Sequence, residues 1–291
     1  MSPTFVVKNS ANVRVFSQKP ISELKSKRIL AQNIVEKQLV ASERIQISKC
    51  PRLIIIDWDD TLNPSSWCMK NGVLTVRPPF GSEIQTLREL SLKVAATLQK
   101  CLNNGLVVIV TNAETGWVEM SAKMLLPDVF RLLAQVPVIS ARSTFESLMR
   151  DAPTMWKALT FGRIISEWFE SFSREALLKD LMIEVLSIGD AHHEREALQH
   201  VSANHQVKFL SKSIKLLERP TIEELKRQHE TIVDKLDIFL SSSVPVDVFY
   251  ANGGEFSDYD TSRSFTIPLR RLKRIRGLRF NSPSRPSFSR E

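Results

Sequence analysis

The sequence predicts an α/β protein with a doubly wound, mostly parallel sheet and helices on both of its faces. Two apolar runs without polar alternation, 53–56 and 106–110, are typical of strands covered on both sides, and a third, 181–188, is interrupted by Glu184. The segments between these runs carry apolar residues at helical spacing. Charged or hydroxyl side chains follow each run, at the strand ends where parallel sheets bind their ligands.

Length and composition fit one sizeable core with appendages. The chain has 291 residues, 43% of them apolar, and no apolar run approaches the roughly 20 residues that a membrane span needs. Its three cysteines lack CxxC spacing, which argues against a disulfide framework or a zinc site and favours a reducing compartment. We therefore expect an intracellular protein, cytoplasmic or nuclear.

Residues 1–49 are expected to form an N-terminal extension. Apolar residues recur at helical spacing from Pro20 to Ser42, which predicts an amphipathic helix that packs on the body or is offered to a partner. Residues 1–22 carry three basic residues and no acidic one, so targeting to an organelle stays open.

Carboxylates end the first predicted strand, 52–57. Asp57 is the first residue after the apolar run, and Asp59 follows on a turn. Like charges this close are costly unless a cation neutralises them, so we expect a divalent metal at this position. The alternative is a turn whose polar residues only cap the next helix.

The chain then leads to the second strand. A turn is expected at 63–67, a short hairpin at 72–77 and a long helix at 82–103, before the strand 106–110. Thr111 ends this strand, and its hydroxyl could hold a phosphoryl oxygen or could be an ordinary helix cap.

A third strand at 136–140, a short helical segment at 143–149 and a helix at 154–171 follow. Lys157 lies near the start of that helix, where the helix dipole disfavours a cation. This placement suggests a functional reason, although a single lysine is more often a surface residue.

The strand 181–188 is followed by a loop with two acidic residues. Gly189 permits a tight turn, and Asp190 and Glu194 bring hard oxygen donors to the edge of the sheet. We expect His192 and His193 to face solvent or to support the site indirectly, because imidazole is a poor ligand for Mg²⁺. A last edge strand at 207–210 and a closing helix at 221–240 complete the predicted body.

Residues 241–291 have the composition of a disordered tail. Residues 261–291 hold nine basic side chains and one acidic one, 9 − 1 = +8, which equals the net charge of the whole chain. The segment 269–280 alternates basic with apolar residues, so a nucleic acid, an acidic protein or a membrane surface are candidate partners. A solvating role without a partner is the alternative.

Four of these sites, in their order along the chain, resemble the motifs of the haloacid dehalogenase (HAD) superfamily of phosphohydrolases. The resemblance covers residues 50–212 of an expected catalytic domain at 50–240. It is carried by Asp57-Trp58-Asp59-Asp60-Thr61-Leu62, by Thr111, by Lys157, and by Gly189-Asp190 followed by Glu194.

The resemblance implies a role for each residue. Asp57 is the expected nucleophile and Asp59 the general acid and base, while Thr111 and Lys157 neutralise phosphate charge. The implied cofactor is Mg²⁺, and its expected ligands are Asp57, the main-chain carbonyl of Asp59, Asp190 and, directly or through water, Glu194. Glu194 departs from the more familiar Asp, which puts its direct bond to the metal in doubt.

The spacing leaves no room for a large cap domain. Family members without caps tend to act on macromolecules or have the site covered by another chain. The resemblance therefore implies an open cleft and a phosphorylated substrate that is large or macromolecular. Two alternatives stay open. The chain could be a non-enzymatic scaffold with this fold, or a nucleic-acid- or membrane-binding protein that acts through its basic tail.

Overall fold

The computed structural model describes residues 50–74, 76–150, 152–172, 182–251 and 254–259. The chain divides into two units, 1–257 and 258–291, and apart from the last residue of one strand the account below concerns the first. The expected N-terminal helix and the basic tail lie outside the described residues.

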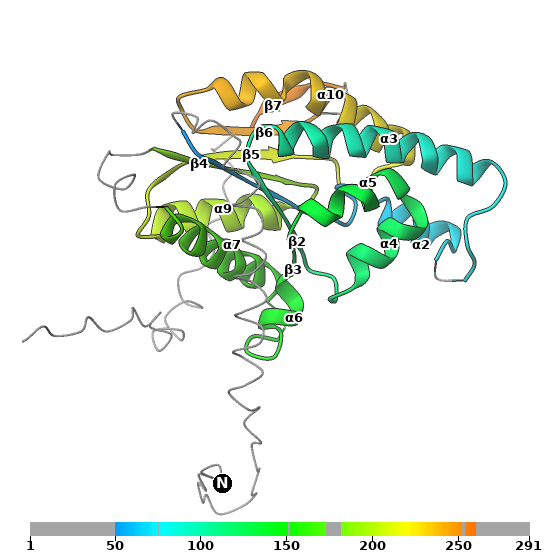
Figure 1. Cartoon of the computed structure of the whole chain (residues 1–291), viewed down its shortest axis with the longest axis horizontal. Coiled ribbons are helices and arrows are strands. Elements are labelled where there is room, and N and C mark those ends of the chain that lie inside the picture. The colour runs from blue at the N-terminus through cyan, green and yellow to red at the C-terminus, as the bar shows by residue number, and fades with distance from the viewer. Residues whose placement is uncertain (1–49, 75, 151, 173–181, 252–253, 260–291) are drawn as a thin grey trace, which may run out of the picture. The chain divides into compact units, whose positions relative to one another are not determined.

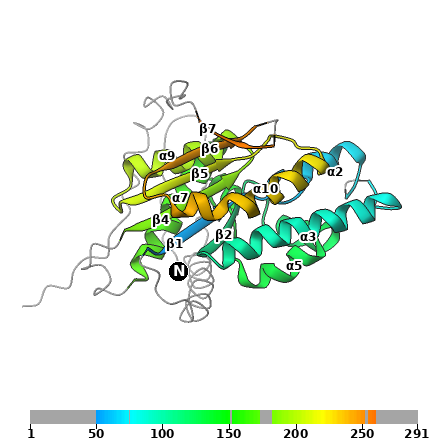
Figure 2. The same cartoon turned by 90° about the horizontal axis from the view of Figure 1, so that it is seen from above.

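Seven strands form one sheet in the order β3-β2-β1-β4-β5-β6-β7, and every pair from β3 to β6 is parallel (Figures 1 and 2). The strands are β1 (Arg52–Ile56), β2 (Leu106–Thr111), β3 (Val138–Ser140), β4 (Ile183–Gly189), β5 (Phe209–Lys215), β6 (Val246–Tyr250) and β7 (Phe256–Asp258). The predicted α/β class and mostly parallel sheet are confirmed.

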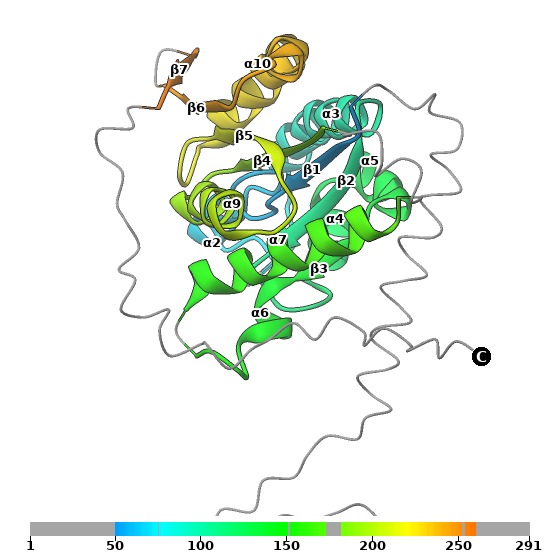
Figure 3. The same cartoon turned by 90° about the vertical axis from the view of Figure 1, so that its left-hand side faces the viewer.

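Helices cover both faces of the sheet (Figure 3). On one face lie α3 (Ser82–Leu102), α4 (Trp117–Leu125), α5 (Pro127–Leu132) and α10 (Ile222–Ser241). On the other lie α6 (Ala141–Phe145), α7 (Pro153–Glu170) and α9 (His192–Asn204). The remaining described helices are the short α2 (Ser65–Asn71) and the 3₁₀ turn η1 (Leu133–Gln135).

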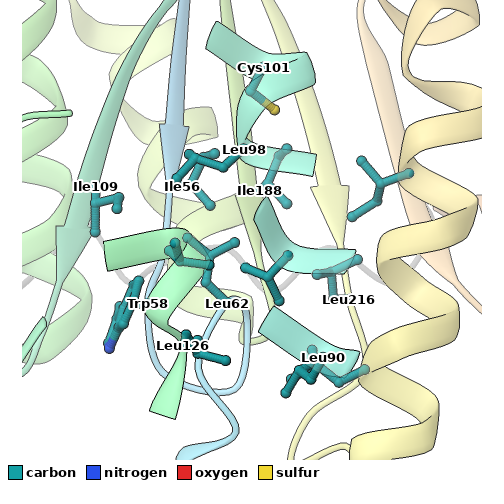
Figure 4. Close-up of a cluster of buried hydrophobic side chains, with 14 of the residues drawn as sticks. Ile56, Trp58, Leu62, Leu90, Leu98, Cys101, Ile109, Leu126, Ile188 and Leu216 are labelled. Carbon is teal, nitrogen blue, oxygen red and sulfur yellow. The ribbon is translucent and has the colours of Figure 1, made fainter. Parts of the chain in front are cut away.

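The central strands β1, β2 and β4 are mostly apolar because each contributes side chains to both cores. In β1, Ile54 and Ile56 join the core under α3 and α10, while Leu53 and Ile55 join the core under α7 and α9. All four side chains are essentially inaccessible to solvent. Figure 4 shows the first core, in which Leu98 of α3 lies over the strands.

The register of the central strands brings the candidate site residues to one edge. Ile56 of β1 pairs with Ile188 of β4, and the backbone N–H of Asp57 donates to the Ile188 carbonyl at 2.9 Å. The residues that follow both strands therefore leave the sheet side by side, at its carboxyl edge.

The polar interruption of β4 has a structural explanation. Glu184 is buried at the amino end of the sheet, where its carboxylate lies 2.7 Å from Arg52 Nε and 3.1 Å from Lys212 Nζ. Lys212 also donates to the Leu240 carbonyl at 3.0 Å, so these charges are paired and hydrogen-bonded, as burial requires.

Three expectations need correction. The boundary at residue 240 is too early, because β6 and β7 continue the sheet beyond α10. For the same reason the strand expected at 207–210 is the longer β5 and does not lie at the edge. The described part of 72–77 forms turns and one isolated bridge, Val73 to Arg77, instead of a hairpin.

None of the described helices is long and apolar enough to span a membrane.

Candidate functional site

Asp57 and Lys157 form a buried ion pair at the end of β1. Lys157 Nζ donates to Asp57 Oδ1 at 2.6 Å, and it also donates to Glu194 Oε1. Lys157 is the fifth residue of α7, and its side chain is 3% exposed. The alternative of a surface lysine is therefore wrong, and burial between two carboxylates explains why a cation is placed early in a helix.

Gly189 makes room for Glu194. A Cβ at position 189 would lie 2.4 Å from Glu194 Cγ, closer than any real contact. The other carboxylate oxygen of Glu194 accepts from the backbone N–H of Ala191 at 3.1 Å, which is the return half of a capping box at the start of α9. Both Glu194 oxygens are thus engaged, so a direct bond from Glu194 to a metal would have to break one of these contacts.

Two carboxyl groups of the site have strongly raised pKa values. Burial raises the pKa of Asp57 to about 7; Lys157 opposes the rise, and the charges of Glu194 and Asp59 add to it. Burial also raises the pKa of Asp190 to about 8, with help from the charges of Asp57 and Glu194. Carboxylates that disfavour each other's charge in this way create a demand for a cation.

Burial opposes the charged form of Lys157, but the charges of Asp57 and Glu194 outweigh it, so the pKa of Lys157 is raised. The lysine therefore stays protonated at neutral pH. It gives this cluster one permanent positive charge.

Asp59 is held by donors from three other segments. Its Oδ1 accepts from Trp117 Nε1 at 2.8 Å and from the Ser65 hydroxyl, and its Oδ2 accepts from Thr111 Oγ1 at 3.2 Å. The Thr111 hydroxyl in turn accepts from the backbone N–H of Ala113 at 2.9 Å. Thr111 thus lies beside Asp59, and it does not cap α4, whose N-cap residue is Gly116.

Thr61 links the loop after β1 to the loop after β4. Its hydroxyl accepts from the backbone N–H of Asp190 at 2.9 Å and lies 3.4 Å from Asp190 Oδ1. The carbonyl of Thr61 is 3.1 Å from Nε2 of His229, a fully buried residue of α10 whose Nδ1 lies 3.0 Å from Thr97 Oγ1. Since burial lowers the pKa of His229 to about 4, the ring is neutral at pH 7 and donates from Nε2.

The capping alternative for the carboxylates after β1 holds for Asp60 alone. Asp60 Oδ1 accepts from the backbone N–H of Ser66 at 2.7 Å, and Oδ2 accepts from the Ser66 hydroxyl, so Asp60 caps α2. Asp60 adopts a left-handed conformation, φ 55°, which aspartate tolerates better than most residues. Among the described residues, neither Asp57 nor Asp59 accepts from a backbone N–H of α2, although Asp59 accepts from the Ser65 hydroxyl at its start.

The candidate cation site rests on few side chains. Among the described residues, no group of three or more His, Cys, Asp and Glu side chains could hold a metal ion. The carboxylates of Asp57 and Asp190 and the main-chain carbonyl of Asp59 are hard oxygen donors, and Mg²⁺ typically uses one or two carboxylates and keeps several waters. The donor set is thus of the kind that suits Mg²⁺.

The two histidines after β4 point to other partners. His192 is exposed, and its Nε2 lies 3.7 Å from Glu218. His193 Nδ1 lies 2.7 Å from the hydroxyl of Thr154, at the start of α7. The exposure of His192 agrees with the expectation that it faces solvent, and an indirect role of His193 in the site stays a prediction.

Sequence reasoning missed the residues that hold the carboxylates in place. Ser65 lies in a segment that the sequence predicts only as a turn, and Trp117 belongs to none of the motifs. The position of Thr61 within the DxDxT pattern was the one available signal for its contact with Asp190. Trp117 offered no such signal, because nothing in its sequence context indicates that an indole N–H meets Asp59.

No family model, curated protein or solved structure matches this chain.

Proposed function

We propose that this chain is a Mg²⁺-dependent phosphomonoester hydrolase of the HAD type that works through an aspartyl phosphate on Asp57. The observation that carries the proposal is the buried contact of Lys157 with Asp57 at the carboxyl end of β1, next to Asp190 at the end of β4. The resemblance of the four motifs, in family order, supports it independently.

Asp57 would act as the nucleophile. One oxygen is held by Lys157, and the other has no hydrogen bond among the described residues, so it is available to attack phosphorus. The new bond joins an Asp57 oxygen to phosphorus while the bond to the leaving oxygen breaks. The charge of Lys157 and the donors around Thr111 would neutralise the phosphoryl oxygens during this step.

Asp59 would serve as general acid and base. It would give its proton to the leaving oxygen, then take a proton from the water that attacks phosphorus and releases phosphate from Asp57. Such proton transfers need a side chain in a fixed place. The three donors on Asp59, from α2, β2 and α4, supply that restraint.

Asp57, Asp190 and the Asp59 carbonyl would hold Mg²⁺, whose charge would stabilise the phosphoryl oxygens and favour ionisation of both carboxylates. The raised pKa values of Asp57 and Asp190 support this proposal, because burial and neighbouring carboxylates disfavour their charged forms and a divalent cation would offset this effect. Glu194 would then act indirectly, by holding Lys157.

The proposed substrate is a large phosphorylated molecule. Between β1 and β2 the described residues form α2, turns and α3, and α3 packs on the sheet and not over the site. Without a cap over this edge, the resemblance implies access for large substrates. The alternative functions through the tail concern residues outside the described part of the chain.

Hydrolysis of p-nitrophenyl phosphate tests the proposal. The native protein should release phosphate with Mg²⁺ and lose this activity with a chelator. Asp57→Asn should abolish it, while the same change at the exposed Asp234 of α10 should leave it intact. Chelator-resistant turnover, or equal activity of the native protein and Asp57→Asn, would refute the assignment and favour a scaffold role.

A further inference from the structure

The helix that follows the second strand has an apolar surface that its packing does not explain. The residues of α4 that face the core are Val118, Ser121, Ala122 and Leu125. Met120 and Met124 are also apolar, yet they are 42% and 48% exposed. Large exposed apolar side chains that lie close together commonly mark binding sites.

Helix geometry places these methionines on one flank of α4. At 100° per residue, Trp117, Met124 and Met120 lie within an arc of about 60°, beside the buried face. Glu119 and Lys123 lie on the opposite flank. The apolar arc of α4 therefore extends past the core on one side only, and Trp117 belongs to that side.

Trp117 connects this flank to the candidate site. Its Nε1 donates to Asp59 Oδ1 at 2.8 Å, so the indole ring reaches the residue proposed as general acid. The leaving oxygen of a substrate must lie within hydrogen-bond reach of Asp59. The group attached to that oxygen consequently begins near Trp117, and Met120 and Met124 follow one and two turns further along the helix.

We propose that the Trp117–Met120–Met124 flank binds an apolar leaving group of the phosphomonoester substrate, such as an alkyl chain or an aryl group. This inference rests on the proposed phosphatase function and adds the chemical class of the substrate. Methionine is suited to this task, since its flexible and polarisable side chain adapts to apolar ligands of varied shape. We assign the substrate to this surface because Trp117, at one end of the flank, contacts Asp59, the carboxylate proposed to protonate the leaving oxygen of the substrate.

The test uses n-alkyl phosphates from ethyl to octyl, kept below their micelle concentrations, with phosphate release as the readout. In the native protein kcat/KM should rise about twofold per added CH₂ group, the ratio expected when each group buries about half of its surface. In the double variant Met120→Gln, Met124→Gln the rise along the series should disappear. Met182→Gln, at another exposed methionine, just before β4, is the control and should keep the native rise.

Binding of the same series to Asp57→Asn in the presence of Mg²⁺, measured by calorimetry, separates this inference from the proposed function. Affinity that rises with alkyl chain length supports leaving-group binding by the flank, even if no turnover is observed. Absence of turnover counts only against the proposed phosphatase activity. Flat affinities, or a rise that survives in the double methionine variant, overturn the inference. If the rise survives and sedimentation shows that the native protein is a dimer and the double variant a monomer, the flank joins two copies of the chain instead of binding substrate.

Discussion

The ammonium group of Lys157 lies 2.6 Å from the carboxylate of Asp57, across 100 positions of sequence and from the opposite side of the sheet edge. Lys157 also contacts Glu194, so one cation serves two buried carboxylates. A buried cluster of charges of this kind is costly to assemble. The cluster lies at the carboxyl edge of the central strands, the edge at which parallel α/β sheets bind their ligands.

Replacing Lys157 by Met should lower phosphatase activity by about a hundredfold or more, because the phosphoryl oxygens lose a fixed positive charge. It should also destabilise the fold by about 3–5 kcal/mol at pH 8, since two buried carboxylates lose their partner. At pH 5 the loss of stability should be smaller, because Asp57 can take up a proton. Urea unfolding at both pH values checks this, with the exposed Lys235→Met as control. Equal losses at pH 5 and pH 8 would contradict the account.

Much of this arrangement could be predicted from the sequence because it depends on local pattern. Asp57 and Gly189-Asp190 directly follow apolar runs, and parallel strands bring such positions together whatever the details of packing. The contacts of Ser65 and Trp117 could not be predicted, since they depend on how α2 and α4 pack over the same edge.

The strand β6 was missed for a related reason. Its five residues, Val246–Tyr250, are short, follow a Ser- and Pro-rich segment and carry Asp247 in the middle. In the structure Asp247 accepts from Arg195 of α9 at 2.6 Å, which satisfies its charge. From the local sequence alone, Asp247 indicates a loop. Its partner Arg195 is 52 positions away in the sequence, so the local pattern does not reveal the ion pair.

Gly189→Ala should impair the site without touching a catalytic atom. The added Cβ would displace Glu194, and Lys157 would lose one of its two carboxylates. We expect a loss of about 1–3 kcal/mol in stability and at least a tenfold loss of kcat. Gly162→Ala is the control, because a Cβ there meets only ordinary contacts at 3.8 Å and beyond and sits within a helix, where Ala is favoured. Normal kcat in Gly189→Ala would show that the contact of Glu194 with Lys157 is dispensable.

Trp117→Phe should affect substrates according to their leaving groups. The variant keeps a ring but loses the donor to Asp59. For alkyl phosphates, which need a proton on the leaving oxygen, kcat/KM should fall about tenfold. For p-nitrophenyl phosphate, whose leaving group departs as an anion, the fall should be much smaller. Trp67→Phe on α2 is the matched control. Equal effects on both substrates would show that Trp117 only supports the fold.

Stability should depend on pH in opposite ways with and without Mg²⁺. Asp57 and Asp190 have pKa values raised from 3.8 to about 7 and about 8, so in the metal-free protein the folded state holds protons that the unfolded state has released. Because the folded state binds more protons than the unfolded state, the free energy of unfolding falls as the pH rises towards the pKa values of these two groups in the folded protein. His229, with its pKa lowered to about 4, acts in the opposite sense below about pH 6.5, so the window from 6.5 to 8 is the informative one.

Between pH 6.5 and 8 the melting temperature of the metal-free protein should therefore fall, and the fall should be smaller in Asp190→Asn. With Mg²⁺ at millimolar concentration the native protein should instead gain stability across this window, because the metal binds the ionised carboxylates. Thermal scans with Mg²⁺ and with a chelator measure both slopes. A metal-free protein whose stability rises from pH 6.5 to 8 would contradict the raised pKa values.

The central claim is that Asp57 carries the phosphoryl group during turnover. The most direct measurement is peptide mass spectrometry after rapid acid quench of the native protein mixed with Mg²⁺ and an aryl phosphate. The account predicts one added phosphoryl group on the peptide that contains Asp57, lost on mild alkaline treatment and absent from Asp57→Asn. A phosphoryl group on another residue, or steady hydrolysis with Asp57 unmodified at every quench time, would contradict it.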